Sequence, residues 1–113
     1  MSTAPAAPDR QALRREVAEA SRATVLAGLN RGTSGNVSAR CDGGFLVTPS
    51  GLASDALRPE QVVYVGMDGT ALGAWPASSE WRIHRDLYLA RPEVAAVVHV
   101  HSPFAVSPAT ATM

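Results

Sequence analysis

The sequence has few of the features that mark secreted, membrane-bound or nucleic-acid-binding proteins. Its one cysteine, Cys41, excludes an intrachain disulfide and a metal site built from several cysteines. Ten basic and ten acidic residues give a formal net charge of zero, and without a long basic run we expect neither nucleic acid nor a membrane as a partner. No apolar run approaches the roughly 20 residues of a membrane-spanning helix, and the first ten residues lack a secretory signal. These absences favour a soluble, cytoplasmic protein.

The composition is that of a protein with a buried core. Hydrophobic residues make up 46% of the 113 positions, which is enough for one globular domain and too many for a disordered chain. The first residues are small and polar. We therefore predict a disordered arm over residues 1–8 and a single domain over residues 9–113.

Local patterns predict a mixture of helices and hairpins. Apolar residues at helical spacing indicate a helix over residues 9–29, capped by Asp9, and another over residues 78–92, capped by Ser78 or Ser79. We expect strands at residues 36–40, 45–48, 61–67 and 94–101, joined in part by turns at 41–44 and 68–69. Because hairpins pair strands antiparallel, the fold class is α/β or α+β, with helices packed on a sheet.

A pair of histidines closes the last predicted strand. Side chains alternate along a strand, so His99 and His101 point to the same side, about 6–7 Å apart along the backbone. Neutral imidazoles are good ligands for zinc and similar divalent metals. The pair therefore predicts a metal site, although two packed or exposed histidines would show the same pattern.

Three short turns of small polar residues have the composition of anion-binding loops. They cover residues 31–38, 48–51 and 78–80, and the third lies at a helix start, where N–H groups and the helix dipole favour an anion. Taken alone, each turn is more often an ordinary glycine-rich turn or a helix cap than an anion site. The phosphate-binding pattern GxxxxGK followed by serine or threonine is absent.

Two titratable residues follow the third turn. Glu80 has the chemistry of a general acid or base, or of a first-turn glutamate that complements the helix dipole. His84 lies one helical turn later. We assign His84 a structural role rather than a metal-binding one, because it belongs to a helix whereas His99 and His101 belong to a strand.

The order of these segments is more specific than any one of them. GTSGNVSAR (32–40), LVTPSG (46–51) and PASSEWRIHRDLYLARPEVAAVVHVHS (76–102) together resemble the class II aldolase/adducin family, and within it the L-fuculose-1-phosphate aldolase branch. The resemblance covers the chain from the first helix to about Phe104. It implies a three-layer α/β/α fold with a mainly antiparallel central sheet.

The resemblance also implies a role for each motif. Glu80 matches the family's catalytic acid/base, and His99 and His101 match two of its zinc ligands, while His84 matches a position that is not a ligand. The residues implied to hold a substrate phosphate are Gly35, Asn36, Ser50, Gly51, Ser78 and Ser79. The implied cofactor is Zn²⁺, although two imidazoles alone are compatible with another divalent metal.

The implied reaction is the cleavage of a ketose 1-phosphate, such as L-fuculose 1-phosphate, to dihydroxyacetone phosphate and an aldehyde. Zinc would spread the negative charge of the enediolate, and Glu80 would shuttle a proton. The phosphate loops would anchor the remote end of the substrate and so orient the reacting end. Members of the family are typically homo-tetramers, so a homo-oligomer is expected.

The sequence stops earlier than the family pattern does. A catalytic zinc normally has three protein ligands, and the family's third histidine lies well downstream of position 113. Pro108 also stands where the family has a helix. We therefore expect a truncated chain, the N-terminal half of the fold only, with little or no aldolase activity of its own. We further expect an unpaired sheet edge near residues 94–101.

Two other functions fit the same resemblance. The scaffold also carries a sugar-phosphate 4-epimerase and a methylthioribulose-phosphate dehydratase; the epimerases tend to have aspartate where this chain has Glu80. A non-catalytic, adducin-like interaction module is the second alternative. Such modules lose the metal histidines and the acid, which are present here as His99, His101 and Glu80.

Overall fold

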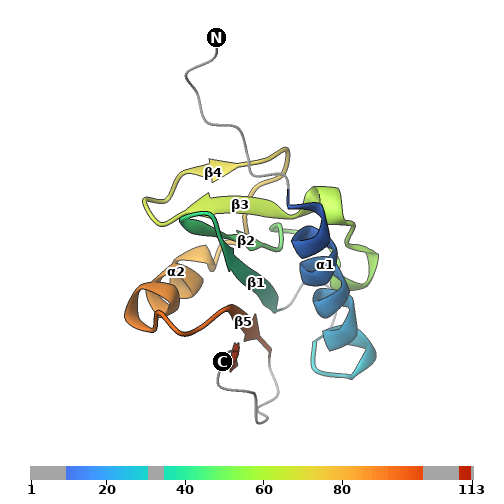
Figure 1. Cartoon of the computed structure of the whole chain (residues 1–113). Coiled ribbons are helices and arrows are strands. Elements are labelled where there is room, and N and C mark those ends of the chain that lie inside the picture. Colours follow the sequence, from blue (N-terminus) through green and yellow to red (C-terminus); the bar gives the residue numbers. More distant parts are fainter. Residues whose placement is uncertain (1–9, 31–34, 101–109, 113) are drawn as a thin grey trace.

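The computed structural model describes residues 10–30, 35–100 and 110–112, and it contains a sheet with a helix on each side (Figure 1). Within these residues, six strands lie in the order β4-β3-β2-β1-β5-β6. All neighbours are antiparallel except β5 and β6, which are parallel. The elements are α1 (Gln11–Leu26), β1 (Asn36–Cys41), β2 (Gly44–Val47), the 3₁₀ turns η1 (Ser54–Ala56) and η2 (Pro59–Gln61), β3 (Val63–Gly66), β4 (Ala71–Leu72), α2 (Trp81–Ala90), β5 (Ala96–His99) and β6 (Thr110–Thr112).

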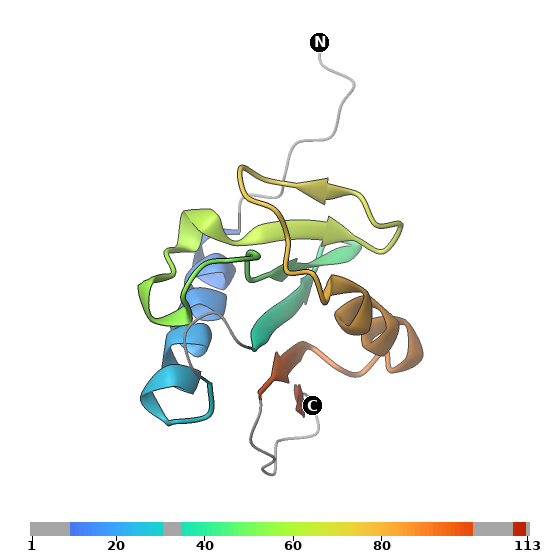
Figure 2. The ribbon, with the colours of Figure 1, turned by 180° about the vertical axis from the view of Figure 1, so that it is seen from behind.

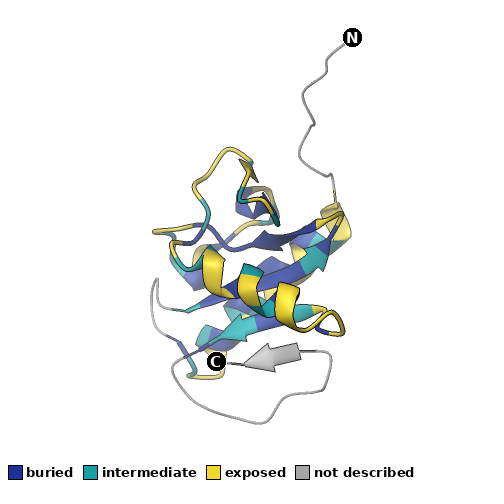
Figure 3. Cartoon of the chain, turned by 90° about the vertical axis from the view of Figure 1, so that its left-hand side faces the viewer, coloured by how far each residue is buried: buried dark blue, intermediate teal, exposed yellow. Residues whose placement is uncertain are grey.

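The two helices pack on opposite faces of the sheet, which gives the expected α/β/α layers (Figure 2). One apolar cluster joins α1 to its face of the sheet, with Val17, Val37 and Leu46 among its members. A second joins α2 to the other face and includes Phe45, Tyr88 and Val97. The outer side of α2 is exposed and the strands behind it are largely buried (Figure 3). The expected fold class is therefore confirmed.

Strand β1 carries apolar side chains to one face and polar ones to the other. Val37 and Ala39 belong to the cluster under α1. Because neighbours in a strand point to opposite faces, Asn36, Ser38 and Arg40 face α2. Asn36 and Ser38 are buried and Arg40 is half-buried, and buried polar side chains must find hydrogen-bonding partners. This strand therefore sets the position of the site described below.

The tight turn between β1 and β2 follows from its residues. Asp42 and Gly43 have φ values of 48° and 75°, as the two central residues of a type I′ turn require. Aspartate and glycine accept this left-handed backbone more readily than other residues do. The turn sets the register that pairs Cys41 with Gly44 and Ser38 with Val47. Cys41 is buried as a free cysteine.

The helices are shorter than the sequence pattern predicts. The first begins at Gln11 with Arg10 in the cap position and no capping side chain; the predicted cap, Asp9, lies outside the described residues, as does the arm over residues 1–8. The second begins at Trp81, so Glu80 is its N-cap and not a first-turn residue. Neither helix of the described chain is long and apolar enough to cross a bilayer.

The expectation of an unpaired edge at residues 94–101 is wrong. Residues 110–112 form β6, which runs parallel to β5 and pairs Ala96 with Thr110 and Val98 with Thr112. The sequence of the tail is compatible with a helix interrupted by Pro108, but Thr110 and Thr112 have the branched side chains that favour strands. Within the described chain, β6 and β4 are therefore the edge strands.

Candidate functional site

A carboxylate and an imidazole meet where the start of α2 passes over β1 and β5. The Glu80 Oε1 atom lies 3.1 Å from Nδ1 of His99 and 2.7 Å from Nδ2 of Asn36, which donates a hydrogen bond to it. Asn36 and His99 are direct partners in the β1–β5 register. Three side chains from three elements therefore converge on one point, where the sequence predicted an acid and a metal ligand.

The helix brings Glu80 to this point through its periodicity. Residues four apart lie on the same face of a helix, so Glu80, His84 and Tyr88 line up along the side of α2 that faces the sheet. The two residues inside the helix, His84 and Tyr88, are its fully buried side chains, with relative exposures of 0% and 1%. Glu80, at the helix end, is only half-buried.

Next to Glu80, a series of hydrogen bonds joins polar side chains of β1 to His84 and Tyr88 of α2. Asn36 Oδ1 contacts His84 Nε2, and Ser38 Oγ lies 2.6 Å from His84 Nδ1 and 2.7 Å from the Tyr88 hydroxyl. Burial, helped by nearby His99 and opposed by Glu80, lowers the pKa of His84 to about 4. Burial likewise raises the pKa of Tyr88 to about 12. Both side chains are therefore uncharged at neutral pH.

His84 has the structural role that its place on a helix predicted. Both of its ring nitrogens face protein partners, Ser38 and Asn36, so neither is directed at a metal position. The sequence did not predict the connection of His84 to Asn36 and through it to Glu80. The i, i+4 spacing of Glu80, His84 and Tyr88 was the available signal, but the polar strand that faces them is distant in sequence.

Two of the three small polar turns lie side by side. The N–H of Ser50 donates to the carbonyl of Pro76 (2.9 Å) and the N–H of Ser78 donates to the carbonyl of Thr48 (3.0 Å). These two amides therefore join the turns and do not point at a ligand. Ser78 Oγ accepts from the N–H of Glu80 at 3.3 Å. Ser50, Gly51 and Ser79 are exposed beside this junction.

The first turn contributes Gly35 and Asn36. Both the backbone conformation at position 35 and the side chain packed against it favour glycine. Gly35 has a φ of 79°, and a Cβ on it would lie 2.3–2.5 Å from the side-chain atoms of Asn30. Any larger residue at position 35 would therefore force the buried Asn30 side chain to move, and it would have to adopt a left-handed backbone. Asn36 is buried, and its amide is directed at Glu80 and His84.

The donor atoms at Glu80 and His99 suit a zinc-like metal. The imidazole of His99 is a good ligand for zinc and similar divalent metals, and the carboxylate oxygen of Glu80 lies beside it, 3.1 Å from Nδ1. His101 lies outside the described residues, and among those described no group of three or more candidate ligands occurs. The residues present therefore fit part of a metal site.

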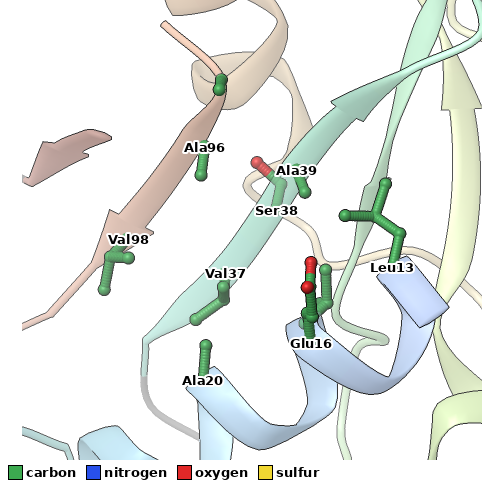
Figure 4. A pocket seen from close by; sticks show the side chains of 10 residues that line it. Leu13, Glu16, Ala20, Val37, Ser38, Ala39, Ala96 and Val98 are labelled. Carbon is green, nitrogen blue, oxygen red and sulfur yellow. The ribbon is translucent and has the colours of Figure 1, made fainter. Parts of the chain in front are cut away.

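A separate apolar groove lies on the opposite face of the sheet. It has a volume of about 340 Å³, between α1 and the strands β1 and β5 (Figure 4). Leu13, Ala20, Val37 and Val98 line it, together with the carboxylate-bearing Glu16. The groove lies on the α1 side of the sheet, whereas Glu80, the N-cap of α2, contacts Asn36 and His99 on the other side. The groove is therefore not part of the candidate site.

Comparison with known proteins places the chain in a family. Residues 15–113 match the family described as "Class II Aldolase and Adducin N-terminal domain". The chain is 47% identical over 95 residues to a 5-methylthioribulose-1-phosphate/5-deoxyribulose-1-phosphate aldolase of Rhodospirillum rubrum, a match that covers 84% of this chain and 43% of that protein. It is 37% identical over 94 residues to L-fuculose phosphate aldolase of Escherichia coli strain K12, covering 83% and 44%.

Solved structures give the same result. An L-fuculose 1-phosphate aldolase superimposes with a TM-score of 0.78 at 25% identity, covering 85% of this chain and 46% of that one. The L-fuculose-1-phosphate aldolase of Thermus thermophilus gives a TM-score of 0.69 at 34% identity, covering 81% and 47%. The chain thus spans less than half the length of these relatives. From the family match and the shared fold together, this chain belongs to the class II aldolase and adducin family.

Proposed function

We propose that this protein takes part in the metal-dependent aldol cleavage of a ketose 1-phosphate, with Glu80 as its acid/base and His99 and His101 as metal ligands. The observation that carries the proposal is the convergence of the Glu80 carboxylate and the His99 imidazole on one point. The relatives support it, because they are named as aldolases of sugar phosphates.

The chain's own residues supply the proton transfer. Both contacts described for the Glu80 carboxylate use Oε1, which leaves Oε2 to exchange a proton with the substrate. The hydrogen bond from Asn36 holds the carboxylate in place for that exchange. His99 and His101 would hold a divalent metal, which would supply Lewis-acid chemistry when bound.

The paired turns supply a place for the phosphate. Ser50 and Ser79 are exposed on these adjoining turns, and Gly51 leaves room for an anion to approach the backbone, since nothing lies within 4 Å of its Cβ position. Ser78 retains a hydroxyl proton after its oxygen accepts from Glu80. Binding the phosphate here fixes one end of the substrate while Glu80 acts on the other.

The test is an aldolase assay on the protein as the cell makes it, including any residues encoded after position 113. The three substrates are 5-methylthioribulose 1-phosphate, 5-deoxyribulose 1-phosphate and L-fuculose 1-phosphate, and dihydroxyacetone phosphate is measured through NADH oxidation by glycerol-3-phosphate dehydrogenase. We expect release from at least one substrate, loss with a chelator, and recovery with zinc.

Substitution separates the proposed acid/base from general effects. Glu80→Gln should lower the rate of cleavage by about 10²–10⁴-fold, as removal of a general acid/base does. Glu16→Gln is the matched control, because Glu16 lies on the far face of the sheet and should leave the rate unchanged. Absence of dihydroxyacetone phosphate with all three substrates, or an epimerised or dehydrated product in its place, would show that the proposal is wrong.

A further inference from the structure

We propose that His84 is a positioning residue: a neutral imidazole, protonated on Nε2, that fixes the orientation of the Asn36 amide and thereby the Glu80 carboxylate. The protonation and the amide orientation rest on the hydrogen-bond geometry and on the burial of these side chains. Their effect on aldol cleavage rests on the proposed function above.

The argument begins at the Glu80 end of the chain. A carboxylate accepts hydrogen bonds and does not donate them, whereas the asparagine amide has a donating nitrogen and an accepting oxygen. The Asn36 atom that faces Glu80 Oε1 must therefore be Nδ2, at 2.7 Å. This choice turns the amide oxygen toward His84.

The orientation of Asn36 then determines the tautomer of His84. An amide oxygen accepts only, so the ring nitrogen that contacts it, Nε2, must carry the proton. A neutral imidazole has one donor and one acceptor, so Nδ1 accepts from the hydroxyl of Ser38 at 2.6 Å. Ser38 Oγ in turn accepts from the Tyr88 hydroxyl at 2.7 Å. The donor and the acceptor of each hydrogen bond from Tyr88 through Ser38 and His84 to Asn36 are thereby assigned.

The alternative arrangements carry a high cost in this buried setting. Moving the proton to Nδ1 would direct the lone pair of Nε2 at the amide oxygen of Asn36. Rotating the amide to relieve that contact would place its oxygen against the Glu80 carboxylate. Asn36, Ser38 and His84 are all at least 95% buried, so no water replaces the lost hydrogen bonds. The charged form is disfavoured as well, because burial lowers the pKa of His84 to about 4.

The charged and titratable groups around His84 agree with this assignment. Glu80 lies on the same helix, His99 is on β5, and Tyr88 follows one turn later on α2. Glu80 is the acidic group among them, and its carboxylate accepts a hydrogen bond from the side chain of Asn36. His84 therefore acts on the carboxylate through the amide, without touching the position of a substrate or metal.

The first test is a nitrogen-15 NMR spectrum of the histidine rings in the 113-residue chain, with His84 assigned by its loss in His84→Gln. We expect the pattern of a neutral ring protonated on Nε2 at pH 7.5, unchanged at pH 5.5. A ring protonated on Nδ1, or a charged ring at pH 5.5, would overturn the proposal. This readout does not depend on any enzymatic activity.

The second test compares two amide substitutions in the protein used for the aldolase assay. The longer side chain in His84→Gln carries an N–H to the position of Nε2, whereas the shorter one in His84→Asn reaches only the position of Nδ1. We expect His84→Asn to lower kcat for cleavage by about 10–100-fold, with KM changed far less. This is the effect of losing the hydrogen bond from the released Asn36 amide to the charged Glu80 carboxylate. His84→Gln should restore most of the rate.

The two variants also separate positioning from folding. Thermal unfolding should report a similar loss of stability in both, because both replace a buried ring with a smaller amide. Equal loss of kcat in the two variants would indicate a purely structural role and overturn the proposal. If the unsubstituted protein releases no dihydroxyacetone phosphate, the proposed function fails, while the NMR result still decides the tautomer.

Discussion

The buried His84 makes the stability of this fold depend on pH, and the size of the effect follows from its pKa. The ring has an ordinary pKa of 6.5 when unfolded and a pKa of about 4 in the folded chain, where burial disfavours its charged form. As the pH falls below 6.5, the unfolded chain binds a proton at this ring and the folded chain does not. The unfolded state therefore gains stability until the pH reaches about 4.

The magnitude is a large part of what holds a domain of this size together. Each tenfold change in proton affinity corresponds to about 1.4 kcal/mol, so lowering the pKa from 6.5 to about 4 removes about 3 kcal/mol of folding free energy across this range. The total stability of a domain is about 5–15 kcal/mol. Above pH 6.5 neither state binds the proton, so His84 contributes no pH dependence there.

The assay is urea unfolding at a series of pH values between 7.5 and 4.5, followed by far-ultraviolet circular dichroism. Carboxylates also titrate near the lower limit, so the informative quantity is the difference in free energy of unfolding between the unsubstituted chain and His84→Gln. We expect that difference to shrink steadily as the pH falls from 6.5, because glutamine does not titrate. Parallel curves for the two proteins would refute the reasoning.

Three further predictions concern residues that hold the site in place. Gly35→Ala should destabilise the fold by more than Gly43→Ala, because both have positive φ but only the first places a Cβ against Asn30; chemical denaturation measures the difference. Arg40→Lys should cost about 1.5–3 kcal/mol, since the guanidinium stacks on Tyr88 and donates to carbonyls at the end of α2 and in the connection from α2 to β5; thermal unfolding checks this. Tyr88→Phe should lower the free energy of unfolding by about 1–3 kcal/mol, because it leaves the buried Ser38 oxygen without its donor. Calorimetry at neutral pH measures the change, and an unchanged stability would contradict this prediction.

The strands, turns and helices could largely be predicted from the sequence, because each is indicated by residues that are neighbours in the chain. Asp42 and Gly43 predict a turn wherever they stand between two apolar strands, and the structure has β1 and β2 on either side of them. The helix ends were less accurate, since Glu80 begins the second helix as its cap while the pattern predicted an earlier start. The residue at which a helix begins depends on which groups accept hydrogen bonds from its first N–H groups. Those acceptors often lie in neighbouring loops.

The parallel pairing of β6 with β5 shows where local reasoning ended. A strand of three residues has too few positions to show an alternating pattern, and Pro108 favoured a broken helix in its place. The partner that stabilises Thr110–Thr112 is β5, which precedes it in sequence and runs in the same direction. Parallel pairing leaves no turn signal in the sequence, because its connection is not a hairpin.

For the site, the sequence by itself determined which groups are present: a glutamate at a helix start, histidines at a strand end, and an asparagine after a glycine in a polar turn. It determined the family as well, through the order of these segments. Only the tertiary structure decided that Glu80 lies against His99 and Asn36, and that the ring of His84 contacts the amide oxygen of Asn36. Strand pairing and helix packing bring these residues together across long stretches of chain, and no local preference of any one segment specifies such contacts.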